Sequence, residues 1–359
     1  MIDSVESVHQ VKDSLGFAQR KRVTLAWSAV LTCVLLAAFV IGIIIGPTPL
    51  ELSDVWLVLK HHLAGGYLPA SHTTIDSIVW HIRVPRLLLG AAVGAGLAVA
   101  GAVLQAVVRN VLADPYTLGI NSGASTGAAL AILFGVGAGF GQFALQGAAF
   151  VGAMGASILM FAIAQQGGQL SSPRLLMSGV VVGYTLSAVT SFLVFASDSA
   201  EGSRSVMFWL LGSLALGKWD FALALSLGVV ILVVVILWLL GTKIDALTIG
   251  DDAARTLGVH PDRLRITLTI LTCLMVGTVV SMAGSIGFVG LVVPHACRRL
   301  VGGSHRHLLP VSALAGAALL LLADITARVL LAPQEIPIGI LTATVGAPLL
   351  FLIVRRANA

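Results

Sequence analysis

The sequence predicts an all-α integral membrane protein with ten transmembrane helices, and its charge pattern is the main reason. Hydrophobic residues make up 57% of the 359 residues, charged residues make up only 10%, and the mean hydropathy is +1.00. A soluble domain carries roughly 25% charged residues. Stretches without any Asp, Glu, Lys or Arg are long enough for membrane helices, and too long for barrel strands of about 10 residues. They cover 23–50, 87–108, 115–173, 175–197, 221–242, 266–297, 307–323 and 336–354.

Two of these stretches are too long for a single span. Residues 115–173 hold two spans that divide near the glycine-rich segment 135–141, and residues 266–297 hold two that meet at a turn over 281–287. Each of the other six holds one span. The total is therefore ten.

The membrane domain takes up nearly the whole chain. Residues 1–25 are a polar N-terminal segment, and residues 26–356 form one ten-span domain without a soluble module. In the longest outer loop, residues 52–63 predict an amphipathic surface helix capped by Ser53. A second short helix is predicted near 205–214.

Glycines four residues apart predict close contacts between spans. Gly90 is paired in this way with Gly94, and Gly123 with Gly127. Because glycine has no side chain, two helix backbones can approach closely at such positions in a membrane.

The basic residues predict the orientation. Lys and Arg favour cytoplasmic loops. With the N-terminus inside, 15 of the 21 Lys and Arg lie in inner segments. We therefore expect a multi-pass protein of the plasma (inner) membrane with both termini in the cytoplasm. The net charge of +5 reflects this bias and does not indicate nucleic acid as a partner. The six outer cations are Lys60, Arg83, Arg86, Arg204, Lys218 and Arg328.

Cysteine and histidine do not form a recognisable metal motif. No outer pair of cysteines is available for a disulfide, since Cys33, Cys273 and Cys297 lie in or at spans. Four histidines fall in the first outer loop, where contact with a metal or a haem-like cargo and simple solvation are both open. They are His61, His62, His72 and His81.

Two motifs resemble catalytic sites, but their contexts argue against that role. Residues 212–218 read GSLALGK, close to a nucleotide-binding P-loop, yet Trp219 replaces the required Ser or Thr in an outer loop. Residues 123–127 read GASTG, with Ser125 as nucleophile and His295 as the nearest candidate base. Such an elbow belongs on a strand–turn–helix unit. We expect no catalytic residue and no ATP site in this chain.

Charged residues at the outer ends of spans form the first candidate site. Arg83 and Arg86 lie three residues apart, so they share a helix face at the outer mouth of span 2. Exposed guanidinium groups there suit either lipid headgroups or the carboxylates of a docking protein. Asp324 and Arg328 are one turn apart in span 9, so we expect an ion pair, with Arg328 also near Glu335.

The longest inner loop, 242–265, forms the second candidate site. Asp251 or Asp252 opens a short helix, and Gly258 closes it in a left-handed conformation. A short helix with small residues fits a groove on another protein and passes a rigid-body movement to the spans. An ordinary connecting helix is the alternative.

The motifs along the chain resemble the permease family that imports ferric siderophores, haem and cobalamin, the FecCD-type subunits of type II ABC importers. The resemblance covers about 80 to 353. Within the inner loop, Asp252-Ala253-Ala254 followed by Gly258 resembles the EAA…G pattern of ABC importer permeases, and Val111 replaces a usual Pro. The remaining motifs are R-x-P-R, Q-x-x-x-R-N-x-L-A-D-P-x-x-L-G, W-L-x-G-S-L, G-F-V-G-L-x-x-P-H-x-x-R, and E-x-P-x-G with G-A-P.

The resemblance implies a role for each site. The outer arginines Arg83, Arg86 and Arg328 correspond to residues that pair with acidic groups on a substrate-binding protein. The inner segment LSSPRL (170–175) corresponds to a cytoplasmic gate that contains Ser171 and Ser172. Spans 5 and 10 line the pathway together with the short helix near 205–214. The ATPase contacts correspond to Asp251, Asp252, Ala253, Ala254 and Gly258.

The resemblance also implies the function and the partners. We expect a permease subunit that translocates an iron chelate, most of all a ferric siderophore, with haem or cobalamin as alternatives. The expected partners are a cytoplasmic ABC ATPase dimer that holds ATP-Mg, a periplasmic or lipid-anchored substrate-binding protein, a second permease copy or paralogue, and membrane lipid. No metal and no cofactor is expected on this chain.

Two other classes make distinct demands on the sequence. An ion-coupled secondary transporter needs an ionisable residue near the membrane midplane, and neither 115–173 nor 175–197 contains Asp, Glu, Lys or Arg. An intramembrane serine protease needs Ser125 and His295 side by side.

Overall fold

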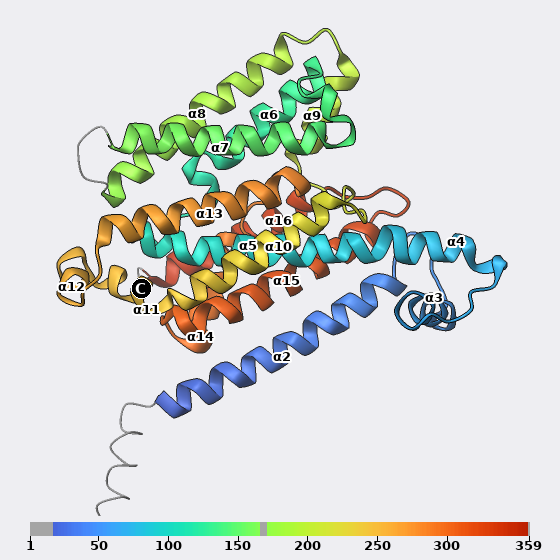
Figure 1. Ribbon diagram of the computed structural model, residues 1–359, viewed down its shortest axis with the longest axis horizontal. Coiled ribbons are helices and arrows are strands. Elements are labelled where there is room, and N and C mark those ends of the chain that lie inside the picture. Colours follow the sequence, from blue (N-terminus) through green and yellow to red (C-terminus); the bar gives the residue numbers. More distant parts are fainter. Residues whose placement is uncertain (1–16, 166–170, 358–359) are drawn as a thin grey trace, which may run out of the picture.

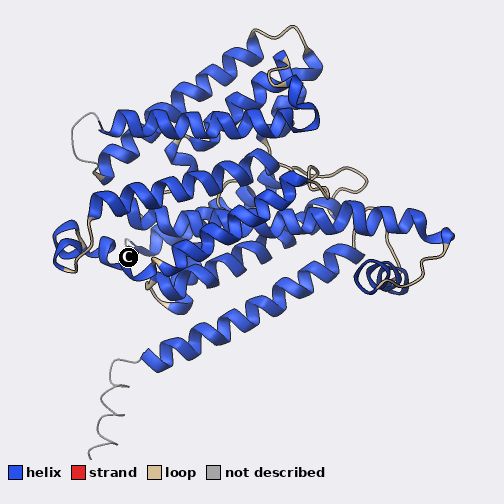
Figure 2. Ribbon diagram, in the orientation of Figure 1, coloured by secondary structure: helices blue, strands red, loops and turns tan. Residues whose placement is uncertain are grey.

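The computed structural model describes residues 17–165 and 171–357, and these residues are helical with no β-strand among them (Figures 1 and 2). Seven helical stretches are long and apolar enough to cross a membrane. They contain α2 (Phe17–Ile44), α5 (Val84–Val108), α7 (Ala144–Gln165), α8 (Ser172–Phe195), α10 (Phe221–Leu239), α13 (Pro261–Ala283) and α15 (His305–Val329).

Three further helices correspond to the remaining predicted spans. They are α6 (Ile120–Phe134), α14 (Val289–Val301) and α16 (Ile338–Ala357). Both predicted divisions are confirmed, because α6 and α7 are separate helices and so are α13 and α14. At 1.5 Å per residue the 13 residues of α14 extend about 20 Å, so α14 alone is shorter than a bilayer core.

The helix α5 forms the centre of the bundle, with α13 and α15 beside it (Figure 1). Nearly every residue of α5 is buried, because its Gly- and Ala-rich surface lets neighbours approach from all sides. A Cβ on Gly94 would collide with the backbone of Gly316 in α15, and one on Gly101 would collide with Gly290 in α14. The close contact predicted for Gly94 is thus confirmed, whereas Gly90 faces the side chain of Leu214.

A second group of helices, α6, α7 and α8, packs along one side of this centre (Figure 1). Gly123 approaches the backbone of Gly152 in α7, and Gly127 approaches that of Ala148. Both predicted glycine contacts between spans are therefore present here. The short helix α9 (Ala200–Leu210) packs against α6 and corresponds to the short helix predicted near 205–214.

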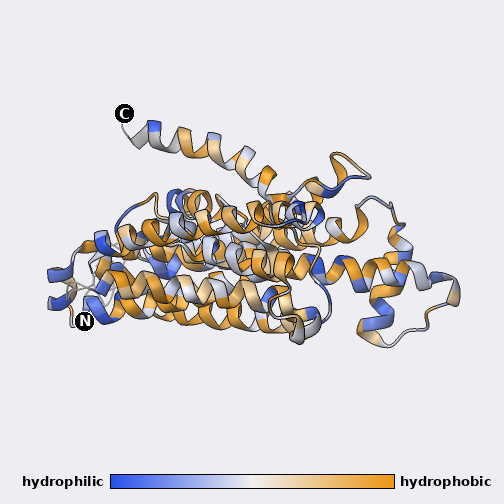
Figure 3. Cartoon of the chain, turned by 90° about the horizontal axis from the view of Figure 1, so that it is seen from above, coloured by the Kyte–Doolittle hydropathy of each residue, from blue (hydrophilic) through white to orange (hydrophobic). Residues whose placement is uncertain are grey.

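Hydrophobic residues lie along the length of the bundle, and hydrophilic residues gather mainly toward its two ends (Figure 3). We call the end where α5 begins the outer end and the opposite end the inner end, following the charge-based prediction. At the outer end are α3 (Leu52–Ala64), η1 (Ala70–His72), α4 (Thr73–Asp76) and the π-helix η2 (Ser77–Arg83). The remaining elements are η3 (Pro115–Leu118), η4 (Ala138–Phe143), α11 (Gly241–Ile249) and α12 (Asp251–Thr256).

The first helix extends farther toward the N-terminus than the first predicted span. The helix α2 begins by Phe17, so its first turns include part of the predicted polar segment 1–25, of which residues 1–16 lie outside the described residues. The surface helix 52–63 is confirmed as α3, but Ser53 does not cap it. Glu51 occupies the N-cap position, and the Ser53 hydroxyl donates a bond to its carboxylate at 3.4 Å.

Candidate functional site

Arg86 lies in a buried ion-pair network at the outer end. Its Nε lies 2.9 Å from Oδ1 of Asp324 in α15, and its Nη1 lies 2.9 Å from Oε2 of Glu335. The Asp324 carboxylate also pairs with Arg328, whose Nε lies 3.0 Å from Oδ2. The predicted pair between Asp324 and Arg328 is confirmed.

Arg83 and Arg328 bind the end of α2. The Arg83 guanidinium donates to the carbonyl oxygens of Ile43 at 2.5 Å and Ile44 at 2.9 Å, and to Thr48 at 2.5 Å. Arg328 donates to the carbonyl oxygens of Gly42 at 3.1 Å and Ile45 at 3.2 Å, which flank the two that Arg83 binds. The last carbonyls of a helix lack partners within the helix and carry partial negative charge, so two arginines here satisfy them.

The predicted exposure of Arg83 and Arg86 is wrong, and Arg328 is buried as well. Only 4% of Arg83, 7% of Arg86 and 3% of Arg328 is accessible in the single chain. The sequence could not reveal this, because their partners lie up to 286 positions away in the chain. Arg86 differs from the other two in one respect. One of its two carboxylate partners, Glu335, has a side chain that is 40% exposed.

A small hollow opens beside Arg86. Its volume is about 150 Å³, and its lining combines the Arg86 and Glu335 side chains with Ser213, Phe208 and Pro337. A buried cation next to an exposed carboxylate is an arrangement that can exchange one acidic partner for another.

Two of the four histidines of the first outer loop, His62 and His72, pair with carboxylates. His62 Nε2 lies 2.6 Å from Asp76 Oδ1, and its ring stacks on Trp80 at 4.2 Å between centroids. His72 Nε2 lies 3.4 Å from Asp54. Among the described residues no group of three or more His, Cys, Asp or Glu is arranged to hold a metal ion. These contacts hold α3 against α4 and η2.

At the inner end, Asp251 joins three elements. It is the first residue of α12, and its Oδ1 accepts hydrogen bonds from Arg265 of α13 at 3.0 Å and from Arg109, which follows α5. Arg109 also donates from Nε to the carbonyl of Leu247 in α11 at 3.1 Å. The prediction that an Asp opens the short helix and that Gly258, at φ +77°, follows it in a left-handed conformation is confirmed.

The residues of α12 face in different directions. Ala254 is fully buried, so its side chain does not reach the surface of the chain. The side chain of Asp252 is fully exposed, and within the described part of the chain its partner is Arg255, at 3.3 Å. Ile249 and Leu257, which flank the helix, are exposed apolar residues that lie outside the sequence motifs. An apolar residue on each side of a short charged helix was the available signal.

Asp245 ties α11 to the start of α15. It accepts bonds from the Ser304 hydroxyl at 2.9 Å and from the His305 backbone N–H at 2.8 Å, and it lies 2.6 Å from His305 Nδ1. Burial raises the pKa of Asp245, but the bonds and the charge of His305 outweigh burial and leave that pKa below its usual value.

The predicted gate segment lies where α8 begins. Ser171 occupies the N-cap position of α8, and the Ser172 hydroxyl donates to the carbonyl of Val107 in α5 at 2.7 Å. Leu170 lies outside the described residues. In the described chain the Ser172 hydroxyl therefore contacts α5, and its gating role stays a prediction.

Neither catalytic motif has the geometry of a catalytic site. The segment 212–218 is an irregular loop preceded by the helix α9, and Gly212 accepts a backbone bond from Ile338. The Ser125 hydroxyl is buried and donates to the carbonyl of Asn121 in its own helix at 2.8 Å. Both observations fit structural roles.

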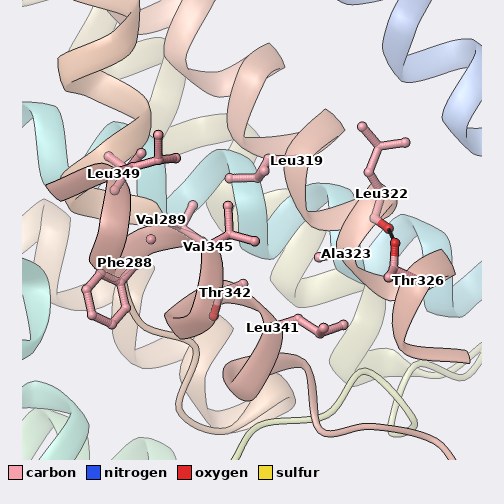
Figure 4. A pocket seen from close by; sticks show the side chains of 12 residues that line it. Phe288, Val289, Leu319, Leu322, Ala323, Thr326, Leu341, Thr342, Val345 and Leu349 are labelled. Atoms are coloured by element: carbon pink, nitrogen blue, oxygen red, sulfur yellow. Dashed lines mark hydrogen bonds between the residues drawn. The ribbon is translucent and has the colours of Figure 1, made fainter. Parts of the chain in front are cut away.

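Two hollows have contrasting linings. The hollow drawn in Figure 4, of about 250 Å³, lies between α14, α15 and α16 and is lined by apolar side chains apart from Thr326 and Thr342. Another, of about 320 Å³, lies between η3, α6 and α8. Its lining carries the hydroxyl groups of Tyr116, Thr117, Ser122, Tyr184 and Ser187.

The chain resembles known transport proteins over most of its length. Residues 34–356 match the FecCD transport family. The cobalamin import system permease protein BtuC of Halobacterium salinarum is 40% identical over 92% of this chain and 96% of its own length. The hemin transport system permease protein HmuU of Yersinia pestis is 39% identical over 79% of this chain and 86% of its own.

A solved structure shows that the similarity to transport proteins extends to the fold. An ABC transporter in an inward-facing conformation, described as being of the metal-chelate type, superposes with a TM-score of 0.79. It is 34% identical and covers 92% of this chain and 98% of its own. The chain belongs to the FecCD transport family and is a multi-pass permease subunit of an ABC importer.

Proposed function

We propose that this permease imports a metal chelate of the tetrapyrrole type, with cobalamin as the first candidate and haem as the second. Relatives with a named cargo include cobalamin and haem permeases, and this observation carries the choice. A ferric siderophore, which the sequence favoured, becomes the third candidate.

The hydroxyl-rich hollow beside α8 supports a bulky cargo with many weak contacts. Its lining offers hydroxyl donors and acceptors and no charged side chain. Such a surface holds a large polar molecule loosely, because no single contact is strong, and lets it leave again. Spans α8 and α16, together with α9, line the proposed pathway, and Ser171 and Ser172 narrow its inner exit.

The importer needs three partners, one at each face and one beside it. A cytoplasmic ATPase dimer binds the inner end, where Asp252, Ala253, Ile249 and Leu257 offer a mixed polar and apolar surface. A substrate-binding protein docks on the outer end. A second permease, either a copy or a paralogue, completes the pathway. Both chain termini lie on the cytoplasmic side.

Arg86 is the arginine best placed to meet the substrate-binding protein. Arg83 and Arg328 donate to the carbonyls at the end of α2, whereas Arg86 lines the hollow and has the partly exposed partner Glu335. We therefore narrow the proposed docking set from three arginines to Arg86 as the direct contact, with Arg83 and Arg328 as its supports.

The cargo can be tested by transport in proteoliposomes. The permease is purified with its ATPase, and radiolabelled cobalamin, haem and a ferric hydroxamate are each offered on a matching binding protein. We expect ATP-dependent uptake of cobalamin at least tenfold above the other two. Uptake of the ferric hydroxamate alone would overturn the proposed cargo.

The same assay tests the secondary-transporter alternative. A proton or sodium gradient without ATP is expected to drive no uptake, since α7 and α8 contain no ionisable residue except Arg174 and Tyr184. Uptake driven by the gradient alone would reverse the proposed energy source.

A further inference from the structure

One carboxylate at the inner end receives arginines from two different spans. Oδ1 of Asp251 accepts from Nη2 of Arg265 at 3.0 Å and from Nη2 of Arg109. Arg265 lies near the start of α13 and its side chain is only 1% exposed, with Asp262 as a more distant partner at 3.5 Å. A buried guanidinium depends on such partners, so the position of Asp251 is fixed relative to α13.

Arg109 is held in an unusual conformation. It follows the last residue of α5 with φ +54°, a left-handed backbone conformation that non-glycine residues seldom adopt. In this conformation its side chain reaches α11 through Leu247 and α12 through Asp251. The same conformation ends α5, because it lets the N–H of Asn110 reach back to the carbonyl of Gln105 at 3.1 Å.

The neighbouring aspartate has the opposite environment. The Asp252 side chain is fully exposed, and it forms an ion pair with Arg255 of the same short helix. Ile249 and Leu257 are exposed beside it. The two adjacent aspartates therefore face in different directions, Asp251 toward the spans and Asp252 toward solvent.

We propose that Asp251 is the positioning residue that carries movement of α12 into α5 and α13, while Asp252 belongs to the surface that contacts the ATPase. This inference rests on the proposed partnership with an ATPase. Rigid helices and the ion pairs at their ends can carry coupling between distant sites. The helix α5 provides such a connection, because it runs unbroken from Val84 to Val108 and carries Arg86 at one end and Arg109 just beyond the other.

The test uses the full complex of permease and ATPase in lipid nanodiscs. Asp251→Asn removes the charge and keeps the size, Asp251→Glu is the conservative variant, and Asp252→Asn is the matched control. Three quantities are measured: the amount of ATPase that co-purifies, basal ATP hydrolysis, and its stimulation by the loaded substrate-binding protein. Arg109→Gln, alone and combined with Asp251→Asn, tests whether the two residues act together.

We expect Asp251→Asn to keep the co-purified ATPase within twofold of wild type and to lose at least fivefold in stimulation and uptake. Asp251→Glu restores most of the stimulation, and the double variant is no worse than the more affected single variant. Asp252→Asn instead lowers the amount of bound ATPase. If Asp251 had only a structural role, Asp251→Asn would lower the melting temperature of the complex. The stimulation of ATP hydrolysis in the assembled complex would then stay unchanged.

Wild-type stimulation in Asp251→Asn, or equal loss of ATPase binding in Asp251→Asn and Asp252→Asn, overturns the inference. Additive losses in the double variant also overturn it. A wild-type complex without any ATP-dependent uptake overturns the proposed function instead, so the wild-type measurement separates the two failures.

Discussion

Asp324 of α15 accepts a hydrogen bond from Arg86 of α5 at 2.9 Å, and both side chains are buried at the outer end. The second oxygen of Asp324 pairs with Arg328, so one carboxylate neutralises two guanidinium groups. Counting Arg83 and Glu335, the cluster holds three cations and two carboxylates, and the carbonyls at the end of α2 supply the remaining negative charge.

Removing the shared carboxylate is expected to destabilise the permease strongly. In Asp324→Asn two buried cations lose their main counter-charge, and breaking a buried ion pair from one side costs about 3–5 kcal/mol. Thermal unfolding in detergent, followed by intrinsic fluorescence, measures the loss. Glu335→Gln is the matched control, and it should cost less than about 1 kcal/mol because Glu335 is partly exposed. Equal losses in the two variants would contradict the central position of Asp324.

Glu335 is expected to compete with the substrate-binding protein for Arg86. Since the incoming acidic side chain has to replace Glu335 beside Arg86, Glu335→Gln should tighten binding about threefold to tenfold, and Arg86→Gln should weaken it by tenfold or more. Surface plasmon resonance with the permease in nanodiscs gives both constants. Arg83→Gln is the control, and it should lower stability more than affinity. Weaker binding in Glu335→Gln would contradict the exchange of partners.

Sequence patterns predicted the spans well. For the outer arginines they predicted the ion pair between Asp324 and Arg328 but not the burial. Membrane helices leave a local signal, because about 20 consecutive residues must be apolar. The Asp324–Arg328 pair also leaves a local signal, since its two members are one helical turn apart. The burial of Arg83 has no local signal. Its acceptors are backbone carbonyls near Ile43 and Thr48, and any sequence there offers carbonyls.

The inner site shows the same limit. A helix that starts at Asp251 and ends before Gly258 follows from local capping chemistry. Which of two adjacent aspartates faces the spans depends on where Arg109 and Arg265 lie, and Arg109 is 142 positions away from Asp251 in the chain. The sequence pattern therefore predicted where the helix lies. It could not show that Asp251 faces the spans and Asp252 faces solvent.

The contact between α5 and α15 is expected to tolerate no side chain at Gly94. A Cβ there would overlap the backbone of Gly316, so Gly94→Ala has to push the two helices apart at a cost of about 1–3 kcal/mol. Gly228 of α10 has open space around it and serves as the control. Gly228→Ala should be neutral or stabilising by up to about 1 kcal/mol, because alanine favours helices. Thermal unfolding compares the two, and equal stability would contradict the close approach of α5 and α15.

The stability of the permease is expected to depend on pH through Asp114, in the segment between α5 and α6. Burial raises the pKa of this carboxyl to about 6, although the bond from the Tyr116 N–H favours the charged form. Because the folded protein holds this proton more tightly than the unfolded chain, Asp114 lowers stability as the pH rises from about 4 to about 6, and the effect is constant above that. A difference of about two pKa units corresponds to a loss of about 3 kcal/mol.

Asp114→Asn removes the ionisation and keeps an oxygen that can accept from the Tyr116 N–H. We expect the variant to match the wild type near pH 4 and to unfold at a higher temperature at pH 7.5, so that the difference between the two curves grows through pH 4–6. Asp252→Asn, at a fully exposed position, is the control and should leave the curve unchanged. A variant that is less stable than wild type at pH 7.5, or a difference that does not vary with pH, would show that the Asp114 charge is accommodated in the folded protein.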